Sequence, residues 1–140
     1  MFEAVASTVQ TYKDHITVDL VNRENQHQFI LKLESVLGNT FHLEIDEKSP
    51  LKPRYRVVDA LKGPVQTVPV QVTKGDDETT VTSENKRAVI VHKPLRIDMY
   101  LDDVLTVSIN SKGLMRFEHL RRKPEGAANA RGAIHADCAA

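Results

Sequence analysis

The 140-residue sequence has little of several features that would point to a specific function. Its single cysteine, Cys138, excludes an internal disulfide and leaves the redox compartment open. Nineteen basic and nineteen acidic residues cancel, so no charge surplus indicates nucleic acid or a cationic partner. No apolar run approaches the ~20 residues of a membrane-spanning helix, and the opening MFEAVASTVQ has no visible signal-peptide pattern. The length suits one domain with a hydrophobic core of its own.

Apolar residues at helical spacing are also lacking, and alternation with a period of two takes their place. Because successive side chains of a strand point to opposite faces, each alternating run would bury one row of Leu, Ile, Val or Phe. Gly38-Asn39 between two such runs predicts a hairpin turn, and Pro69 predicts an edge strand. About ten short strands at regular intervals are typical of an antiparallel β-sandwich. The predicted strands cover residues 5–12, 15–22, 28–37, 41–46, 65–72, 79–82, 87–92, 95–101, 105–109 and 115–119.

Three adjoining runs near the C-terminus predict an antiparallel meander. Apolar and polar residues alternate in the two runs Leu95–Leu101 and Leu105–Ile109, which are separated by the acidic pair Asp102-Asp103. The odd-numbered apolar residues of both runs are expected to face the core. Asn110–Gly113 supplies turn residues, and Met115–His119 is predicted to be the third strand. Phe117 is expected to anchor that strand against the opposing sheet.

Two parts of the sequence resemble the N-terminal region of glycoside hydrolase family 31 α-glucosidases. Ser108–Leu120, SINSKGLMRFEHL, is similar to the family pattern S-x-N-x-x-G-L-x-x-F-E-H, and Lys93–Asp98 fits the strand opening P-[FL]-[RK]-[ILV]-D. Ser49–Leu61, SPLKPRYRVVDAL, is similar to P-L-[KR]-P-R-[YF]-x-V-P-D-V-L, with Val58 and Ala60 replacing the usual proline and valine. The branch it resembles most is the endoplasmic-reticulum glucosidase II α subunit and the neutral α-glucosidases.

The resemblance implies a galactose-mutarotase-like N-terminal β-sandwich, present here only in part over residues 1–120. In the family, the catalytic nucleophile and acid belong to a downstream (β/α)₈ barrel, so this chain alone is expected to be inactive. The parent enzyme would be a retaining exo-α-glucosidase that removes terminal α-glucose from N-linked glycans in the endoplasmic-reticulum lumen. Its expected partners are the barrel domain, a glucosidase II β-type subunit and the oligosaccharide, with no cofactor, no nucleic acid and no membrane span.

The last twenty residues differ in character from the rest. Residues 121–140 are rich in alanine, contain one isolated large aliphatic residue, Ile134, and show no alternation. We expect this segment to be a disordered or divergent tail, because it offers little apolar surface to offset the ordering of its backbone.

No catalytic, cofactor-binding or metal-binding residue is predicted. A glycosidase needs two carboxyls facing each other across a sugar, one with a raised pKa, and the acidic residues of this chain lie along strands or in turns. No histidine pair has the spacing of a helical metal motif, so strand or surface positions are the simpler interpretation. The acidic turn Asp76-Asp77-Glu78 lacks the spaced ligands of a calcium loop. The residues weighed were Glu44, Asp46, Glu47, Asp98, Asp102 and Asp103, the histidines His15, His27, His42, His92, His119 and His135, and the tail residues Asp137 and Cys138.

Aromatic residues are also few, with three tyrosines, four phenylalanines and no tryptophan. A sugar-binding sandwich usually offers an aromatic platform, for which Tyr100 and Tyr55 are the candidates; packing roles are the favoured interpretation. Arg54 is expected to position the proline-containing block through a carboxylate. A free-standing β-sandwich that binds carbohydrate or protein remains the alternative function.

Overall fold

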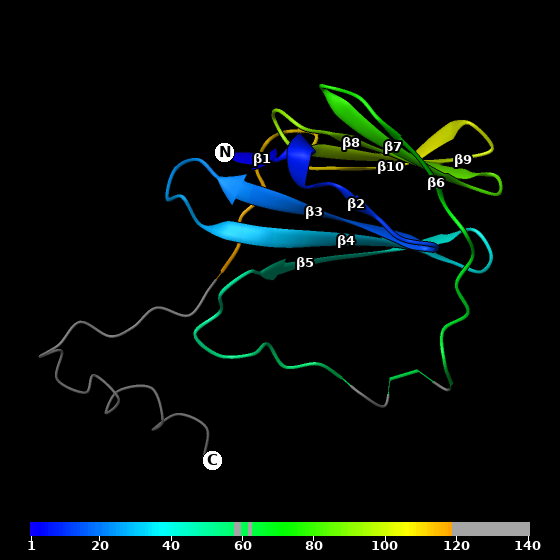
Figure 1. Ribbon diagram of the computed structural model, residues 1–140, viewed down its shortest axis with the longest axis horizontal. Helices are drawn as coiled ribbons and strands as arrows, with labels where there is room; N and C mark the ends of the chain where they lie inside the picture. Colours follow the sequence, from blue (N-terminus) through cyan, green and yellow to red (C-terminus); the bar gives the residue numbers. More distant parts are fainter. Residues whose placement is uncertain (58–59, 62, 119–140) are drawn as a thin grey trace, which may run out of the picture.

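The computed structural model describes residues 1–57, 60–61 and 63–118, and these form two antiparallel sheets of five strands each (Figure 1). The first sheet has the order β1-β3-β4-β5, with β2 also paired to β3, and the second has the order β10-β9-β8-β7-β6. Residues of both sheets pack into one hydrophobic core, so the predicted antiparallel β-sandwich is confirmed. The first sheet contains β1 (Phe2–Ala4), β2 (Gln10–Thr11), β3 (His15–Asn22), β4 (Gln28–Val36) and β5 (Thr40–Glu47), and a 3-10 turn covers Ala6–Thr8. The second contains β6 (Gln71–Lys74), β7 (Glu78–Ser83), β8 (Lys86–Val91), β9 (Arg96–Leu101) and β10 (Val104–Ile109).

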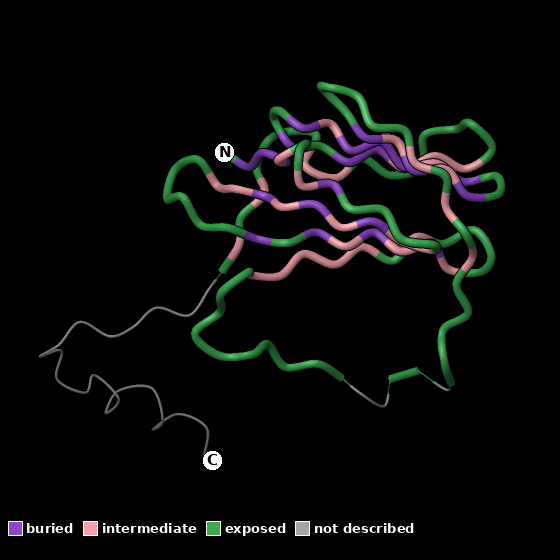
Figure 2. The backbone as a smooth tube through the Cα atoms, in the orientation of Figure 1, coloured by how far each residue is buried: buried purple, intermediate pink, exposed green. Residues whose placement is uncertain are grey.

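The core follows the alternation of the sequence. Phe29, Leu31 and Leu33 of β4 are at most 1% exposed, and Ile90 of β8 and Ile97 of β9 meet them from the second sheet. Each such side chain contributes about 1.5–3 kcal/mol on burial. Figure 2 shows the buried residues gathered on the strands, whereas the long connection from β5 to β6 is exposed along most of its length.

The N-terminal strand links the two sheets, and the sequence pattern did not predict it. β1 pairs with β3, from Phe2 opposite Asn22 to Ala4 opposite Leu20. On its other side, the backbone carbonyl of Phe2 accepts a hydrogen bond from Leu95 N at 2.9 Å. Three residues are too few to show a period of two, which is why the strand escaped detection.

Hydrogen bonds of polar side chains also connect the two sheets. Ser35 Oγ of β4 donates to Ser83 Oγ of β7 at 2.9 Å, and Ser83 Oγ donates to the Pro69 carbonyl at 2.8 Å. Lys86 is 1% exposed, and its Nζ donates to the Gly38 carbonyl at 2.6 Å in the β4–β5 turn. Gly38 has φ +82°, a conformation that glycine adopts without steric cost. These bonds fix the predicted hairpin turn against the opposite sheet.

Three predicted strands are wrong. Within residues 5–12, Ala6–Thr8 forms a 3-10 turn closed by the hydrogen bond from Thr8 N to the Val5 carbonyl, and only Gln10–Thr11 is a strand. Residues 115–118 form no strand, so only two of the three strands of the predicted meander are present among the described residues. The predicted alternation of burial does hold there, because Met115 and Phe117 are partly buried and their neighbours are exposed.

Of the predicted strand at residues 65–72, only residues 71 and 72 are in a strand, β6. Gln66 and Val68 instead hydrogen bond to the end of β4, with Leu37 N donating to the Gln66 carbonyl at 2.8 Å and Val68 N donating to the Ser35 carbonyl at 3.0 Å. Proline at position 69 cannot donate to a ladder, which limits regular pairing there.

The predicted core face of β10 is also wrong in part. Leu105 and Val107 were expected to be buried, but they are 51% and 47% exposed, and only Ile109 packs against the core. The register with β9 shifts between Leu105 and Val107, and β10 is the outer strand of its sheet. An outer strand with a bulge can place apolar residues at the surface. The predicted tail at residues 121–140 lies outside the described residues.

Candidate functional site

One edge of the first sheet carries a row of ion pairs between β5 and the segment that follows it. Arg56 contacts Glu44 and lies 2.8 Å from Asp46. Arg54 lies 3.4 Å from Asp46 and 3.8 Å from Glu47. We call these five residues the β5 edge surface. The expectation that Arg54 positions this segment through a carboxylate is confirmed.

The same arginine joins the two parts of the sequence that resemble family 31 enzymes. The Arg54 guanidinium lies 4.4 Å from the ring centroid of Phe117, a cation–π arrangement. The Phe117 ring in turn packs on Phe29, with ring centroids 4.5 Å apart. Arg54 also donates to the backbone carbonyl of Glu118. Residues that are more than sixty positions apart in sequence therefore form one structural contact.

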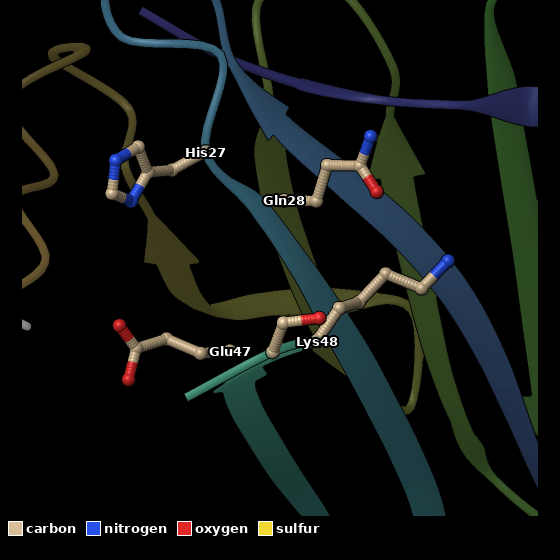
Figure 3. Close-up of a pocket in the computed structure, with 5 residues that line it drawn as sticks. His27, Gln28, Glu47 and Lys48 are labelled. Atoms are coloured by element: carbon tan, nitrogen blue, oxygen red, sulfur yellow. The ribbon is translucent and has the colours of Figure 1, made fainter. Parts of the chain in front are cut away.

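A small polar pocket lies beside the β5 edge surface (Figure 3). It has a volume of about 240 Å³ and is lined by His27, Gln28, Glu47, Lys48 and Ser49. Figure 3 shows the His27 ring and the Glu47 carboxylate extending to one side of the strand ends and the Lys48 side chain to the other. Only one carboxyl lines the pocket, which is also smaller than the ~300–1,000 Å³ of most ligand sites.

Four carboxyls among the described residues have pKa values shifted downward. The pKa values of Glu3, Asp14, Glu24 and Glu34 are lowered by hydrogen bonds, to Arg23, Thr67, the N-terminal amine and Lys32 respectively. A glycosidase general acid needs the opposite shift, a raised pKa. Hydrogen bonding to Glu44 also raises the pKa of Arg56 above its ordinary value, so this guanidinium stays charged.

The other acidic candidates belong to β9 and the turn after it. Asp98 is 6% exposed, accepts a hydrogen bond from Arg96 at 2.9 Å and another from Ser108 at 2.6 Å. Asp102 and Asp103 form the β9–β10 turn with positive φ, as in the hairpin turns that favour Asp and Gly. Each of these carboxylates thus has a structural partner or a turn position.

The described histidines lie in three places, and two of them, His15 and His42, are both opposite Glu34 on the outer face of the first sheet. His92 is buried, with Nε2 3.0 Å from Thr79 Oγ1 and Nδ1 3.0 Å from the Asp76 carbonyl. His27 lines the small pocket. At the opposite end of β3, His15 Nδ1 lies 2.7 Å from Asp14, and its ligand atom, that of Asp14 and that of Glu34 lie within 4.8 Å of one another. Asp14 and Glu34 were not among the site residues considered from the sequence, because they lie twenty positions apart and come together only through the pairing of β3 with β4. His119, His135, Asp137 and Cys138 lie outside the described residues.

The tyrosine candidates behave differently from each other. Tyr100 is partly covered by Arg87, whose guanidinium lies 4.0 Å from the ring centroid, so this tyrosine packs as expected. Tyr55 is 88% exposed, and the prediction that it packs is wrong. Its segment follows β5 without pairing as a strand, so the ring has no sheet to pack against.

Comparison with known proteins gives consistent matches. The family of glycosyl hydrolase 31 N-terminal galactose mutarotase-like domains matches residues 30–138. The chain is 34% identical over 123 residues to neutral alpha-glucosidase AB of mouse, and the alignment covers 86% of this chain and 13% of the mouse protein.

The described fold also matches solved structures. The glucosidase II alpha subunit, solved with Tris bound, superposes with a TM-score of 0.71 at 18% identity, covering 89% of this chain and 16% of that chain. The catalytic subunit in a complex with the binding domain of its regulatory subunit gives a TM-score of 0.71 at 17% identity, covering 92% and 17%. At this identity the structural matches establish the fold, and the chain spans less than a fifth of each relative.

Proposed function

The chain belongs to the family of glycosyl hydrolase 31 N-terminal galactose mutarotase-like domains, and on this basis we propose that it is a non-catalytic N-terminal part of an α-glucosidase of the glucosidase II type. The observation that carries the proposal is the family match over residues 30–138. The mouse relative supports it, because the aligned region is only 13% of that enzyme. A (β/α)₈ barrel needs about 250 residues, more than the whole of this chain.

In this proposal, the sandwich is a folded unit beside the catalytic barrel, which performs the chemistry. The parent enzyme hydrolyses terminal α-glucose of N-linked glycans, with retention, in the endoplasmic-reticulum lumen. The solved relative described as endoplasmic-reticulum glucosidase II supports the location, and its complex with a regulatory subunit supports a β-type subunit as a partner of the parent. In the part of the chain that the structure describes, no helix is long and apolar enough to cross a membrane.

The alternative is a free-standing sandwich that binds carbohydrate. One observation favours it, the 88% exposed ring of Tyr55, because exposed aromatic rings can stack on sugars. A glycan-binding measurement on the 140-residue chain separates the two functions. Binding of α-glucosylated oligosaccharides that Tyr55→Ala abolishes would favour the alternative.

The proposal has a direct negative test. The purified chain should hydrolyse a chromogenic α-glucoside no faster than buffer does. Turnover above this blank that an α-glucosidase inhibitor suppresses would show that the chain carries its own catalytic site and would overturn the proposal.

A chimeric enzyme provides the positive test. The aligned segment of the mouse enzyme is replaced by the matching residues of this chain, and α-glucosidase activity is measured. Activity should persist, because the segment supplies a fold rather than catalytic groups. The control chimera carries Phe29→Asp, which puts a charge into the core and should abolish folding and activity. An inactive first chimera, alongside an isolated chain that folds, would contradict the proposed role.

A further inference from the structure

A row of potential metal ligands crosses the outer face of the first sheet. His15 of β3 is directly opposite Glu34 of β4, and Glu34 is directly opposite His42 of β5. Side chains opposite each other on neighbouring strands have Cβ atoms about 4.5–5.5 Å apart. Asp14 precedes His15, and the ligand atoms of Asp14, His15 and Glu34 lie within 4.8 Å of one another. The structure therefore brings two carboxylates and one imidazole together, with His42 next to Glu34 on the neighbouring strand.

We propose that Asp14, His15, Glu34 and His42 form a zinc-binding site. Zinc binds histidine nitrogen and carboxylate oxygen at about 2.0–2.2 Å and prefers four ligands in a tetrahedral arrangement. His15 Nδ1 already lies 2.7 Å from Asp14 Oδ1, and His42 Nδ1 lies 3.5 Å from Glu34 Oε2. The ligand atoms of Asp14, His15 and Glu34 lie within 4.8 Å of one another, and rotation of the exposed His42 side chain would bring its imidazole to them as the fourth ligand. The proposal does not depend on the function proposed above.

The chemistry of the ligands favours zinc over calcium or magnesium. Calcium requires six to eight oxygen ligands, and magnesium keeps an octahedral shell of oxygen. Imidazole nitrogen suits zinc and its neighbours among the transition metals. The two carboxylates of the site balance the double positive charge of the ion.

Surrounding groups hold two of these ligands in place. The Thr67 side chain hydrogen bonds to the Asp14 carboxylate. The Tyr12 ring stacks on the His15 ring, with centroids 4.3 Å apart and planes inclined by 9°. Ser35 N donates to the Asp14 carbonyl at 2.9 Å, which fixes the backbone of the turn. Such outer contacts orient metal ligands and increase affinity.

One cation competes for the site. Lys32 Nζ lies 2.7 Å from Glu34 Oε1, and the Lys32 side chain is 36% exposed. Zinc would displace this amine, which can turn into solvent at small cost because partly exposed ion pairs contribute little.

Zinc titration of the whole chain tests the proposal. The 140-residue chain is made without a polyhistidine tag and with Cys138→Ala, so that neither a tag nor the thiol binds zinc. Isothermal titration calorimetry with zinc chloride should give one site per chain. His15→Asn and Glu34→Gln should each weaken binding at least ~100-fold, and Thr67→Val about 10-fold. His27→Asn, at the other end of β3, is the matched control and should bind as the parent does.

A spectroscopic measurement covers variants that fold poorly. Cobalt in the parent chain should give the intense visible bands of a four-coordinate ion, and added zinc should remove them while calcium should not. Circular dichroism shows whether each variant is folded. The proposal is overturned if folded His15→Asn and Glu34→Gln chains bind zinc with the affinity of the parent, if cobalt gives only the weak bands of its hydrated ion, or if calcium displaces it.

Discussion

Replacement of Phe117 by alanine tests the contact that joins the two family-like parts of the sequence. The Phe117 ring packs on Phe29 at 4.5 Å and lies 4.4 Å from the Arg54 guanidinium. Replacing a fully buried phenylalanine by alanine lowers the free energy of unfolding by about 3–5 kcal/mol. Phe117 is only partly buried, so the burial contribution is about half of this. The pair with Phe29 adds about 0.5–1.5 kcal/mol. Phe117→Ala should therefore lower the free energy of unfolding by about 2–4 kcal/mol.

Urea denaturation followed by circular dichroism measures this loss. With a slope of about 1.5 kcal/mol/M, the midpoint should fall by about 1.3–2.7 M. Phe29→Ala, at a site that is 1% exposed, should cost more, about 3–5 kcal/mol. Glu118→Ala is the matched control: its side chain is exposed, and the backbone carbonyl that accepts from Arg54 remains. It should change stability by less than about 0.5 kcal/mol. If Glu118→Ala is as damaging as Phe117→Ala, the alternating burial of residues 115–118 is refuted.

Two other perturbations give clear expected results. Lys86→Met leaves the backbone carbonyls of the β4–β5 turn without their buried donor, so it should lower the free energy of unfolding in urea by about 2–4 kcal/mol. Lys48→Met, the control at an exposed ion pair, should lower it by less than about 1 kcal/mol. Equal losses would contradict the role of the buried amine. The hydrogen bond from Lys32 lowers the pKa of Glu34 below its ordinary 4.5, so this carboxylate stabilises the fold above that pH and the stabilisation is lost as pH falls through the lower folded-state pKa. Stability measured between about pH 5 and pH 3 should fall less steeply in Glu34→Gln and in Lys32→Met, and an unchanged slope in both would refute this linkage.

The sequence predicted the parts of the fold in which one strand face is fully buried. β3 and β4 have the expected bounds to within a residue because Ile, Leu and Phe alternate with polar residues over eight or nine positions. β1 is too short to show alternation. The strand predicted at residues 115–119 was wrong because apolar alternation indicates one-sided burial, which Phe117 achieves against Phe29 without a neighbouring strand.

The candidate sites depend more on register than on local pattern. The sequence suggested that Arg54 would meet a carboxylate, since acidic residues lie close by in β5. It could not place Arg54 on Phe117, because that contact depends on the segment after β10 crossing to the first sheet, where Phe117 packs on Phe29. The His15, Glu34 and His42 row likewise arises only when β3, β4 and β5 pair in one register. A shift of one residue would send these side chains to opposite faces.

The position of β1 has a consequence for the time at which the domain can complete its fold during synthesis. Phe2 is made 93 residues before Leu95, whose N donates to the Phe2 carbonyl, and Ala4 N likewise donates to the carbonyl of the much later His92. At about 5–20 residues per second, some 5–20 seconds of translation separate these partners. For most of that interval β1 has only β3 as a strand neighbour, because the residues beyond β8 that hydrogen bond to it have not yet been translated.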